Sequence, residues 1–178
     1  MVLLHLFEAS LTSDDLPVQF GFKKKSSCSH ALFAFNESVE YFTSNRTKVH
    51  AAFLYASKAC DKVLHNGLLW NYYAKNVPMC LVLLLRSWYS QLQCSVRWQN
   101  KFGDSFPVMC GVCQDGVLSP YLFALYIDDL IVSLRLSGYG LHISQLFIGC
   151  LLYADDIVLL SPSCYGLRHL VNICEHFR

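Results

Sequence analysis

The stretch Leu151-Leu-Tyr-Ala-Asp-Asp-Ile-Val-Leu-Leu160 decides the fold of this chain. Its apolar residues are typical of two buried strands, and the carboxylates of Asp155 and Asp156 interrupt them at a turn. Burial of a carboxylate without a partner is costly, so a bound divalent cation would explain an acidic pair between apolar strands. Aspartate is also common in solvated turns, so these residues alone leave both interpretations open.

Helices and short strands alternate around this turn. Apolar periodicity and helix-start signals predict helices over 31–42, 63–72, 78–89, 119–136 and 167–174. Short apolar runs between polar residues predict strands over 49–55, 94–98, 106–109, 146–153 and 157–160. The pattern predicts an α+β fold in which helices pack on one face of an antiparallel sheet.

Several residues carry signals for helix ends. Asp61 precedes the predicted helix 63–72 and is a candidate N-cap, because its side chain can accept hydrogen bonds from the first turn. Ser119 and Pro120 place a hydroxyl at the N-cap and a proline at the first helical position of another helix. Gly138 is expected to end that helix.

The composition indicates a folded domain without a general affinity for polyanions. Hydrophobic residues make up 54% of the 178 residues and charged residues 15%, while the formal net charge is only +1. Any surface that binds nucleic acid would therefore be local. No apolar stretch approaches the roughly 20 residues of a membrane helix, so we expect a soluble, intracellular chain that does not bind membranes.

Nine cysteines and a second acidic pair complete the chemically notable residues. An odd number of cysteines, several in apolar runs, indicates reduced and buried thiols of an intracellular protein. Cys110 and Cys113 have metal-ligand spacing, but no second pair completes a tetrahedral zinc site. Asp128 and Asp129 lie within a predicted helix, where we expect them to face water or cap a neighbouring element.

An ordered set of segments resembles the motif series of reverse transcriptases. The set consists of Lys58-Ala-Cys-Asp61, Gly111-Val-Cys-Gln-Asp-Gly-Val-Leu-Ser-Pro120 and Tyr153-Ala-Asp-Asp156. The flanking segments look like non-LTR retrotransposon polymerases: Gln19-Phe-Gly-Phe22, His65-Asn-Gly-Leu-Leu69, Leu122-Phe-Ala-Leu-Tyr-Ile-Asp-Asp-Leu130 and Gly138-Tyr-Gly-Leu-His142. The likeness runs from about residue 19 to the end and rests on several motifs in the right order.

This resemblance implies the architecture and the activity of the chain. It implies a right-hand polymerase, with about 19–50 on the fingers side and 51–178 as a palm with interleaved fingers elements. Residues 1–178 would then be a partial reverse transcriptase domain with partial fingers and no thumb. The implied activity is RNA-directed DNA polymerisation, with an RNA template, a DNA primer, deoxynucleotides and Mg²⁺ or Mn²⁺.

The resemblance also assigns roles to residues. Asp155 and Asp156 would be catalytic metal ligands, and Tyr153 would shape the turn against the primer end. The residues implied in nucleotide or template binding are Gln114, Gly116, Ser119, Cys60, Lys58, Lys23, Lys24 and Lys25.

The chain departs from the family pattern at the implied site. Tyr55 stands where the family has its first metal-binding aspartate, and a neutral phenol is a poor ligand for magnesium. Asp61 is a weak substitute, because its role as a helix cap is the simpler explanation. In the family, an aromatic residue replaced here by Cys60 crowds the ribonucleotide 2′-hydroxyl. Asp115 replaces a glycine and Cys113 replaces an arginine.

Three hypotheses follow from these departures. The first is a reverse transcriptase fold with little or no activity, because every departure weakens metal or nucleotide binding. The second is an active polymerase that is completed in trans. The third is a non-catalytic module that binds nucleic acid or protein, with a duplex held by charge in a groove lined by Lys23–Lys25, Arg97 and Lys101.

Overall fold

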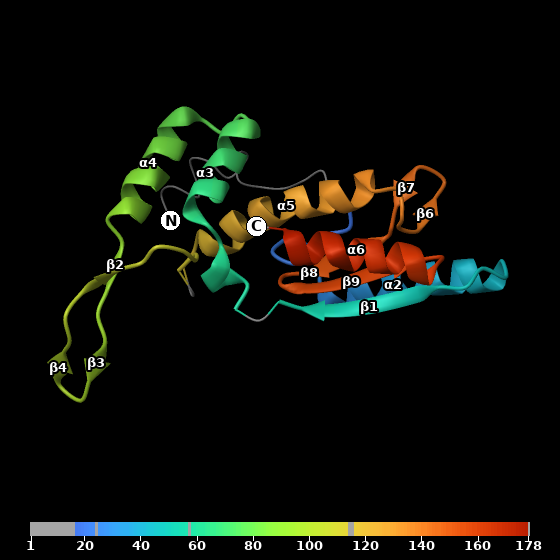
Figure 1. The fold of residues 1–178 in the computed structure, drawn as a ribbon, viewed down its shortest axis with the longest axis horizontal. Coiled ribbons are helices and arrows are strands. Elements are labelled where there is room, and N and C mark those ends of the chain that lie inside the picture. The colour runs from blue at the N-terminus through green and yellow to red at the C-terminus, as the bar shows by residue number, and fades with distance from the viewer. Residues whose placement is uncertain (1–16, 24, 57, 114–115, 178) are drawn as a thin grey trace.

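A three-stranded antiparallel sheet lies at the centre of the fold (Figure 1). The structure, a computed structural model, describes residues 17–23, 25–56, 58–113 and 116–177. The sheet has the order β1-β9-β8 and consists of β1 (His50–Tyr55), β8 (Cys150–Tyr153) and β9 (Asp156–Ser161). The strands predicted over 146–153 and 157–160 are confirmed as a hairpin, except that residues 146–147 form a separate strand. The strand predicted over 49–55 pairs with β9.

Helices cover both faces of this sheet. α6 (Cys164–His176) packs on β1 and β9, over the face that carries Leu54. α2 (Cys28–Ser44) lies on the other side, where the rings of Phe35 and Phe53 are 5.8 Å apart (Figure 1). The antiparallel α+β fold is thus confirmed, but the prediction that helices pack on one face is wrong. The strands are apolar without alternation, so both of their faces need cover.

The core lies where α5 (Ser119–Leu136) meets α6 and α3 (His65–Ala74). α4 (Met79–Ser90) packs on the far side of α3 (Figure 1). These four helices and the strands β8 and β9 each contribute at least one fully buried side chain to this core, among them Leu68, Tyr72, Leu85, Leu134, Leu152, Leu159 and Leu170. All five predicted helices are present, with ends that differ by a few residues.

A long hairpin follows α4 and extends away from the sheet (Figure 1). Its inner pair is β2 (Gln93–Cys94) with β5 (Phe106–Pro107), and its outer pair is β3 (Arg97–Trp98) with β4 (Lys101–Phe102). The strands predicted over 94–98 and 106–109 are confirmed in part, because the first is interrupted and β3 pairs with β4, which precedes the second predicted strand. A smaller hairpin of β6 (His142–Ile143) and β7 (Leu146–Phe147) was not predicted.

The long hairpin of β2, β3, β4 and β5 does not support the predicted basic groove. Arg97 and Lys101 lie on β3 and β4, at the end of the hairpin that extends away from the central sheet (Figure 1), whereas residues 18–20, which precede the predicted lysines, hydrogen-bond to β8. The segments that carry the predicted groove residues are therefore not adjacent. The physical reason is that residues 91–109 pair with each other rather than with the sheet.

Two predicted helix caps are wrong. Asp61 lies inside a 3-10 turn (η1, Cys60–Lys62), and Leu64 is the residue before α3. Ser119 is the first residue of α5 rather than its cap, and its hydroxyl donates a hydrogen bond to the Cys113 carbonyl. The Ser119 hydroxyl is therefore engaged with the segment before α5 rather than with the first turn of the helix.

The Asp128-Asp129 pair holds two helices together. Asp128 is buried, and its Oδ2 lies 3.1 Å from the Nζ of Lys75 at the end of α3. Lys75 Nζ also donates to the Leu125 carbonyl at 2.9 Å and lies 3.6 Å from Asp129 Oδ1. The prediction that both acids face water or cap a neighbouring element is therefore wrong for Asp128, which is an ion-pair partner.

Most thiols are on the surface, contrary to the prediction of buried cysteines. Cys150 alone of the nine is buried, and Cys60 and Cys174 are half-buried. Burial raises the pKa of Cys174 to about 11, and the nearby Glu175 adds to this effect. The other six cysteines are exposed, because several lie on outward positions of helices such as α2 and α4. Among the described residues, no helix is long and apolar enough to cross a membrane.

Candidate functional site at the carboxylate turn

The acidic pair forms a two-residue turn at one end of the sheet. Tyr153 pairs with Asp156 across β8 and β9, so Ala154 and Asp155 are the two loop residues. Ala154 has a φ of 58°, in the left-handed region that tight hairpin turns use. The predicted position of Asp155 and Asp156 at a strand-to-strand turn is confirmed.

Tyr55 completes a row of side chains across the three strands. It pairs with Asp156 on β9, which in turn pairs with Tyr153 on β8. Directly opposite residues of an antiparallel sheet point to the same face, so two phenols flank one carboxylate. The Tyr55 side chain is 74% exposed, so it stands free of the core.

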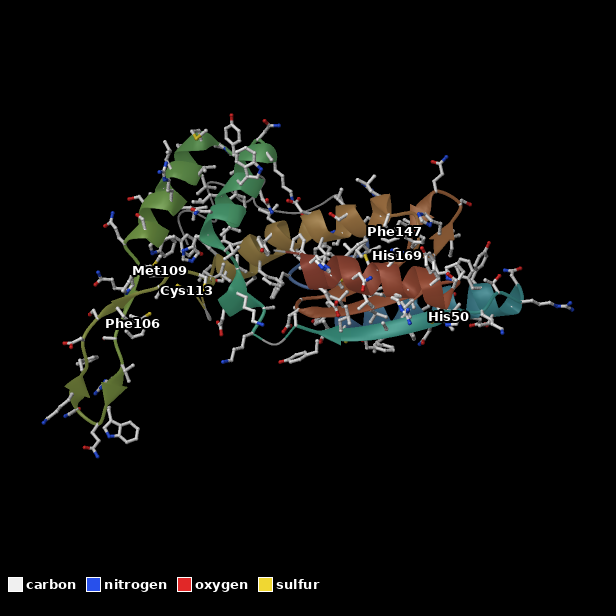
Figure 2. The ribbon with its side chains drawn as sticks, in the orientation of Figure 1. His50, Phe106, Met109, Cys113, Phe147 and His169 are labelled. Atoms are coloured by element: carbon white, nitrogen blue, oxygen red, sulfur yellow. The ribbon has the colours of Figure 1, made fainter. Side chains whose placement is uncertain are left out.

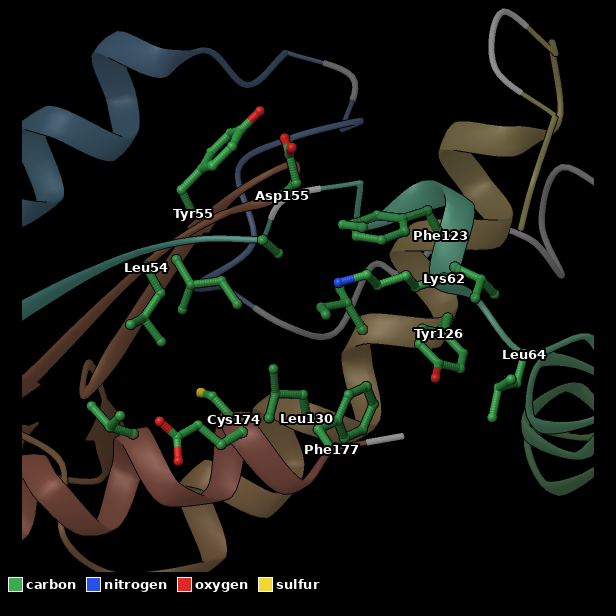
Figure 3. Close-up of a pocket in the computed structure, with 17 residues that line it drawn as sticks. Leu54, Tyr55, Lys62, Leu64, Phe123, Tyr126, Leu130, Asp155, Cys174 and Phe177 are labelled. Carbon is green, nitrogen blue, oxygen red and sulfur yellow. The ribbon is translucent and has the colours of Figure 1, made fainter. Parts of the chain in front are cut away.

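The two aspartates line different cavities. Asp155 lines a cavity of about 580 Å³ between β1, α5 and α6. Figure 3 shows the Asp155 side chain beside that of Tyr55. Asp156 and Tyr153 line a second cavity of about 520 Å³ that is closed by α2. Tyr55 lines both cavities, so the same side chain borders the cavity of each aspartate.

The first cavity contains two charged residues that the sequence analysis did not consider. Lys62 and Glu175 line it together with Asp155, and apolar side chains such as Phe123 and Leu130 form the rest of its wall (Figure 3). Their place in the cavity could not be predicted from the sequence, because Lys62 lies on η1 and Glu175 on α6, which are far apart along the chain.

Residues 18–21 support the turn from behind. Phe20 N donates to the Leu152 carbonyl at 2.8 Å, and Leu152 N donates to the Val18 carbonyl at 2.9 Å. Gly21 follows directly, and a Cβ added there would lie 2.1 Å from the backbone nitrogen of Ala154. The glycine therefore permits a close approach of two backbones. Its place in the Gln19-Phe-Gly-Phe22 segment was the only signal for this role.

Cys60 and the segment before α5 lie close to the same end of the sheet. Val112 N donates to the Cys60 carbonyl at 2.8 Å, which joins two of the motif segments. Burial raises the pKa of the Cys60 thiol, and the charges of Asp155 and Asp61 raise it further. The structure thus brings Cys60 near Asp155, as the motif order implied.

The remaining predicted contacts are spread along the chain. Ser119 and Gly116 lie together at the start of α5, since a Cβ on Gly116 would lie 2.6 Å from Ser119 Oγ. Lys23, Lys25 and Lys58 line neither cavity at the turn. Gln114, Asp115 and Lys24 lie outside the described residues.

A metal-binding set is not assembled at the turn. Across residues 17–23, 25–56, 58–113 and 116–177, no three His, Cys, Asp or Glu side chains lie close enough to hold a metal ion. Among the described residues, Asp155 and Asp156 are two carboxylates without a third donor of that kind. Because two ions need more oxygen ligands than this pair supplies, the described residues do not fit a two-ion centre.

Comparison with known structures defines the class of the fold. The chain superimposes on an apo telomerase from Candida tropicalis that lacks its C-terminal domain, with a TM-score of 0.68 and 13% sequence identity. The match covers 98% of this chain and 36% of the telomerase chain. The chain therefore shares the mixed helix-and-sheet fold of the matched part of that structure.

Sequence comparison then gives the family. The family model for reverse transcriptase (RNA-dependent DNA polymerase) matches residues 2–178, so the chain belongs to the reverse transcriptase family. It is 26% identical over 156 residues to the retrovirus-related Pol polyprotein of the type-2 retrotransposable element R2DM of Drosophila melanogaster. It is 27% identical over 146 residues to a probable RNA-directed DNA polymerase from transposon BS of the same organism.

These relatives are much longer than this chain. The matches cover 88% and 82% of the chain but only 15% and 16% of the two relatives. The resemblance to non-LTR retrotransposon polymerases, based on the motifs, is thereby confirmed at the level of the family.

Proposed function

We propose that this chain is a reverse-transcriptase-type polymerase domain with little or no nucleotidyl transfer activity. The observation that carries the proposal is the position of Tyr55, directly opposite Asp156 and in the same cavity as Asp155. The family places a carboxylate at this point, and divalent ions prefer carboxylate oxygens to a neutral phenol. The donor set then lacks one of its three acids.

Further departures at the site support the same proposal. Cys60 leaves a small thiol where the family has an aromatic ring, and its pKa is raised rather than lowered, so it adds no charge at neutral pH. Cys113 removes a positive charge that would favour an incoming triphosphate. Ser119 and Gly116 are the remaining candidates for contacts with the nucleotide or the template.

The wider assignment extends the family resemblance to the whole chain. In this proposal, residues 51–178 form a palm with interleaved fingers elements, and about 19–50 lie on the fingers side. The partners are an RNA template, a DNA primer and deoxynucleotides, with Mg²⁺ or Mn²⁺ as the ion that an intact site would take. The sequence similarity to the two Drosophila melanogaster relatives supports these assignments. The chain spans about 15% of the length of those relatives.

Primer extension tests the proposal. Purified chain, an RNA template with an annealed DNA primer and labelled deoxynucleotides are incubated with Mg²⁺ and then with Mn²⁺. We expect no incorporation above that of an Asp155→Asn variant, because the metal site is incomplete without the third acid.

The control must separate inactivity from misfolding. Circular dichroism and a cooperative melting transition show that the wild type and the variant are folded. Incorporation by the wild type that disappears in Asp155→Asn would contradict the proposal and favour an active polymerase, complete by itself or completed in trans.

A further inference from the structure

The hairpin of β2, β3, β4 and β5 exposes several large apolar side chains, and we call residues 93–109 the arm. Every strand residue of the arm is exposed. Trp98 is 76% exposed and Phe102 70%. Figure 2 labels Phe106 and Met109 near the base of the arm, where both are also exposed. A soluble domain seldom presents such rings to water unless they contact a ligand.

Cations alternate with the rings at the tip of the arm. Arg97 pairs with Phe102 across the strands, and Trp98 pairs with Lys101. The guanidinium carbon of Arg97 lies 5.5 Å from the centre of the Phe102 ring, and Arg97 Nη2 donates to Asn100 Oδ1 at 3.2 Å. Each face of the tip therefore offers one aromatic ring and one positive charge.

The tip is held in this arrangement by its turn. Gln99 has a φ of 48°, in the left-handed region of tight hairpin turns, and Gly103 N donates to the Val96 carbonyl at 2.9 Å. Asp104 is the one acid among residues 93–109, against two cations, so the arm carries a net charge of +1. The rings are thus displayed on a hairpin whose charge favours polyanions.

We propose that the arm binds single-stranded nucleic acid, with bases stacked on Trp98 and Phe102 and phosphates paired with Arg97 and Lys101. Stacking on exposed rings with nearby cations is how proteins hold single strands without sequence preference. A duplex has no free base faces for these rings. Protein interfaces are enriched in aromatic residues and arginine but depleted of lysine, whereas Trp98 here lies opposite Lys101.

This inference goes beyond the proposed function and rests on it only for the kind of partner. It requires no metal ion, primer or nucleotide. RNA binding is therefore measured in EDTA, where polymerisation cannot occur. Failure of the arm to bind RNA is then distinguishable from failure of the proposed function in the primer-extension assay.

The test is fluorescence anisotropy with a labelled single-stranded RNA of about 12 nucleotides, a length typical of such sites. We expect Trp98→Ala to weaken binding by about tenfold, the effect of losing one stacked base. Trp70→Ala is the matched control, because Trp70 is 69% exposed on α3 and its ring contact is with Tyr73. It should leave the affinity unchanged.

Two further probes separate stacking from charge. An abasic strand of the same length should bind more weakly than the intact strand, and Lys101→Ala should reduce the salt dependence by about 0.7 in log–log slope. The proposal would be overturned if the wild type bound no RNA, or if it bound a duplex more tightly than the single strand. It would also be overturned if the wild type bound the abasic and intact strands equally, or if Trp98→Ala bound RNA as tightly as the wild type. If the wild-type chain self-associates, and Trp98→Ala abolishes this self-association without changing the affinity for RNA, the proposal would be overturned. The arm would then be a contact between copies of the chain.

Discussion

Replacing Gly21 with alanine is expected to lower the free energy of unfolding by about 3 kcal/mol, near the upper end for overpacking at a single site. The added Cβ would lie 2.1 Å from Ala154 N and 2.9 Å from Ala154 Cα, and both are backbone atoms that cannot rotate away. The clash would push residues 18–21 off β8 and break the hydrogen bonds between Phe20, Val18 and Leu152. Urea unfolding followed by circular dichroism measures the effect.

Gly67→Ala is the matched control for this prediction. A Cβ there meets its nearest atom at 3.6 Å, an ordinary contact, and alanine is a better helix former than glycine. We expect this variant to equal the wild type or to gain about 0.5 kcal/mol. A Gly21→Ala protein as stable as the wild type would mean that residues 18–21 do not support the turn.

Replacing Tyr55 with aspartate is expected to raise the affinity for Mn²⁺ by at least about tenfold, which corresponds to about 1.4 kcal/mol. The new carboxylate would lie opposite Asp156 and line the cavity of Asp155. Without metal, like charges directly opposite in a sheet are destabilising, so the variant should melt at a lower temperature than the wild type. Mn²⁺ should reverse that loss, because an ion that binds the native state stabilises it.

The control for this substitution is Tyr73→Asp. Tyr73 is 56% exposed on α3, so the same chemical change is made away from the turn. Melting temperatures of the three proteins with and without Mn²⁺ give the comparison. A Tyr55→Asp protein whose response to Mn²⁺ equals that of Tyr73→Asp would contradict the assignment of this position to a metal site.

We do not expect Tyr55→Asp to restore full synthesis. Cys60 and Cys113 would still occupy positions where the family has an aromatic and a basic side chain. Primer extension by the variant at the level of an active family member would show that these positions matter little.

The sequence predicted the features that depend on local patterns. The hairpin around Asp155 and Asp156 follows from two apolar runs and a two-residue turn, which are adjacent in the chain. The helix 119–136 was placed within its observed ends because its start and its glycine stop are both local signals. The strand that carries Tyr55 was recognised for the same reason.

Features that depend on distant contacts were not predictable from one sequence. Asp61 and Ser119 are good caps by residue type, but Asp61 lies inside η1, and the Ser119 hydroxyl donates to the Cys113 carbonyl. The buried ion pair of Asp128 with Lys75 joins residues 53 positions apart, and no pattern along one helix reveals it. The approach of Gly21 to Ala154 is another contact of this kind.

The candidate site shows the same division. The motif order placed Cys60, Asp155 and Asp156 at one end of the fold, and the structure brings Cys60 and Asp155 close together. The separation of Asp155 and Asp156 into different cavities, both of which Tyr55 lines, depends on how α2 and α6 cover the sheet. That arrangement required the structure.

The number of Mn²⁺ ions bound by the wild-type chain tests the central claim most directly, namely that the carboxylate turn is not a complete metal site. Free Mn²⁺ is counted by electron paramagnetic resonance during titration of the folded wild type and of Asp155→Asn. We expect no tight binding in either protein and no difference between them, because Asp155 and Asp156 lack a third acid. Two ions bound per chain by the wild type, and lost in Asp155→Asn, would contradict it.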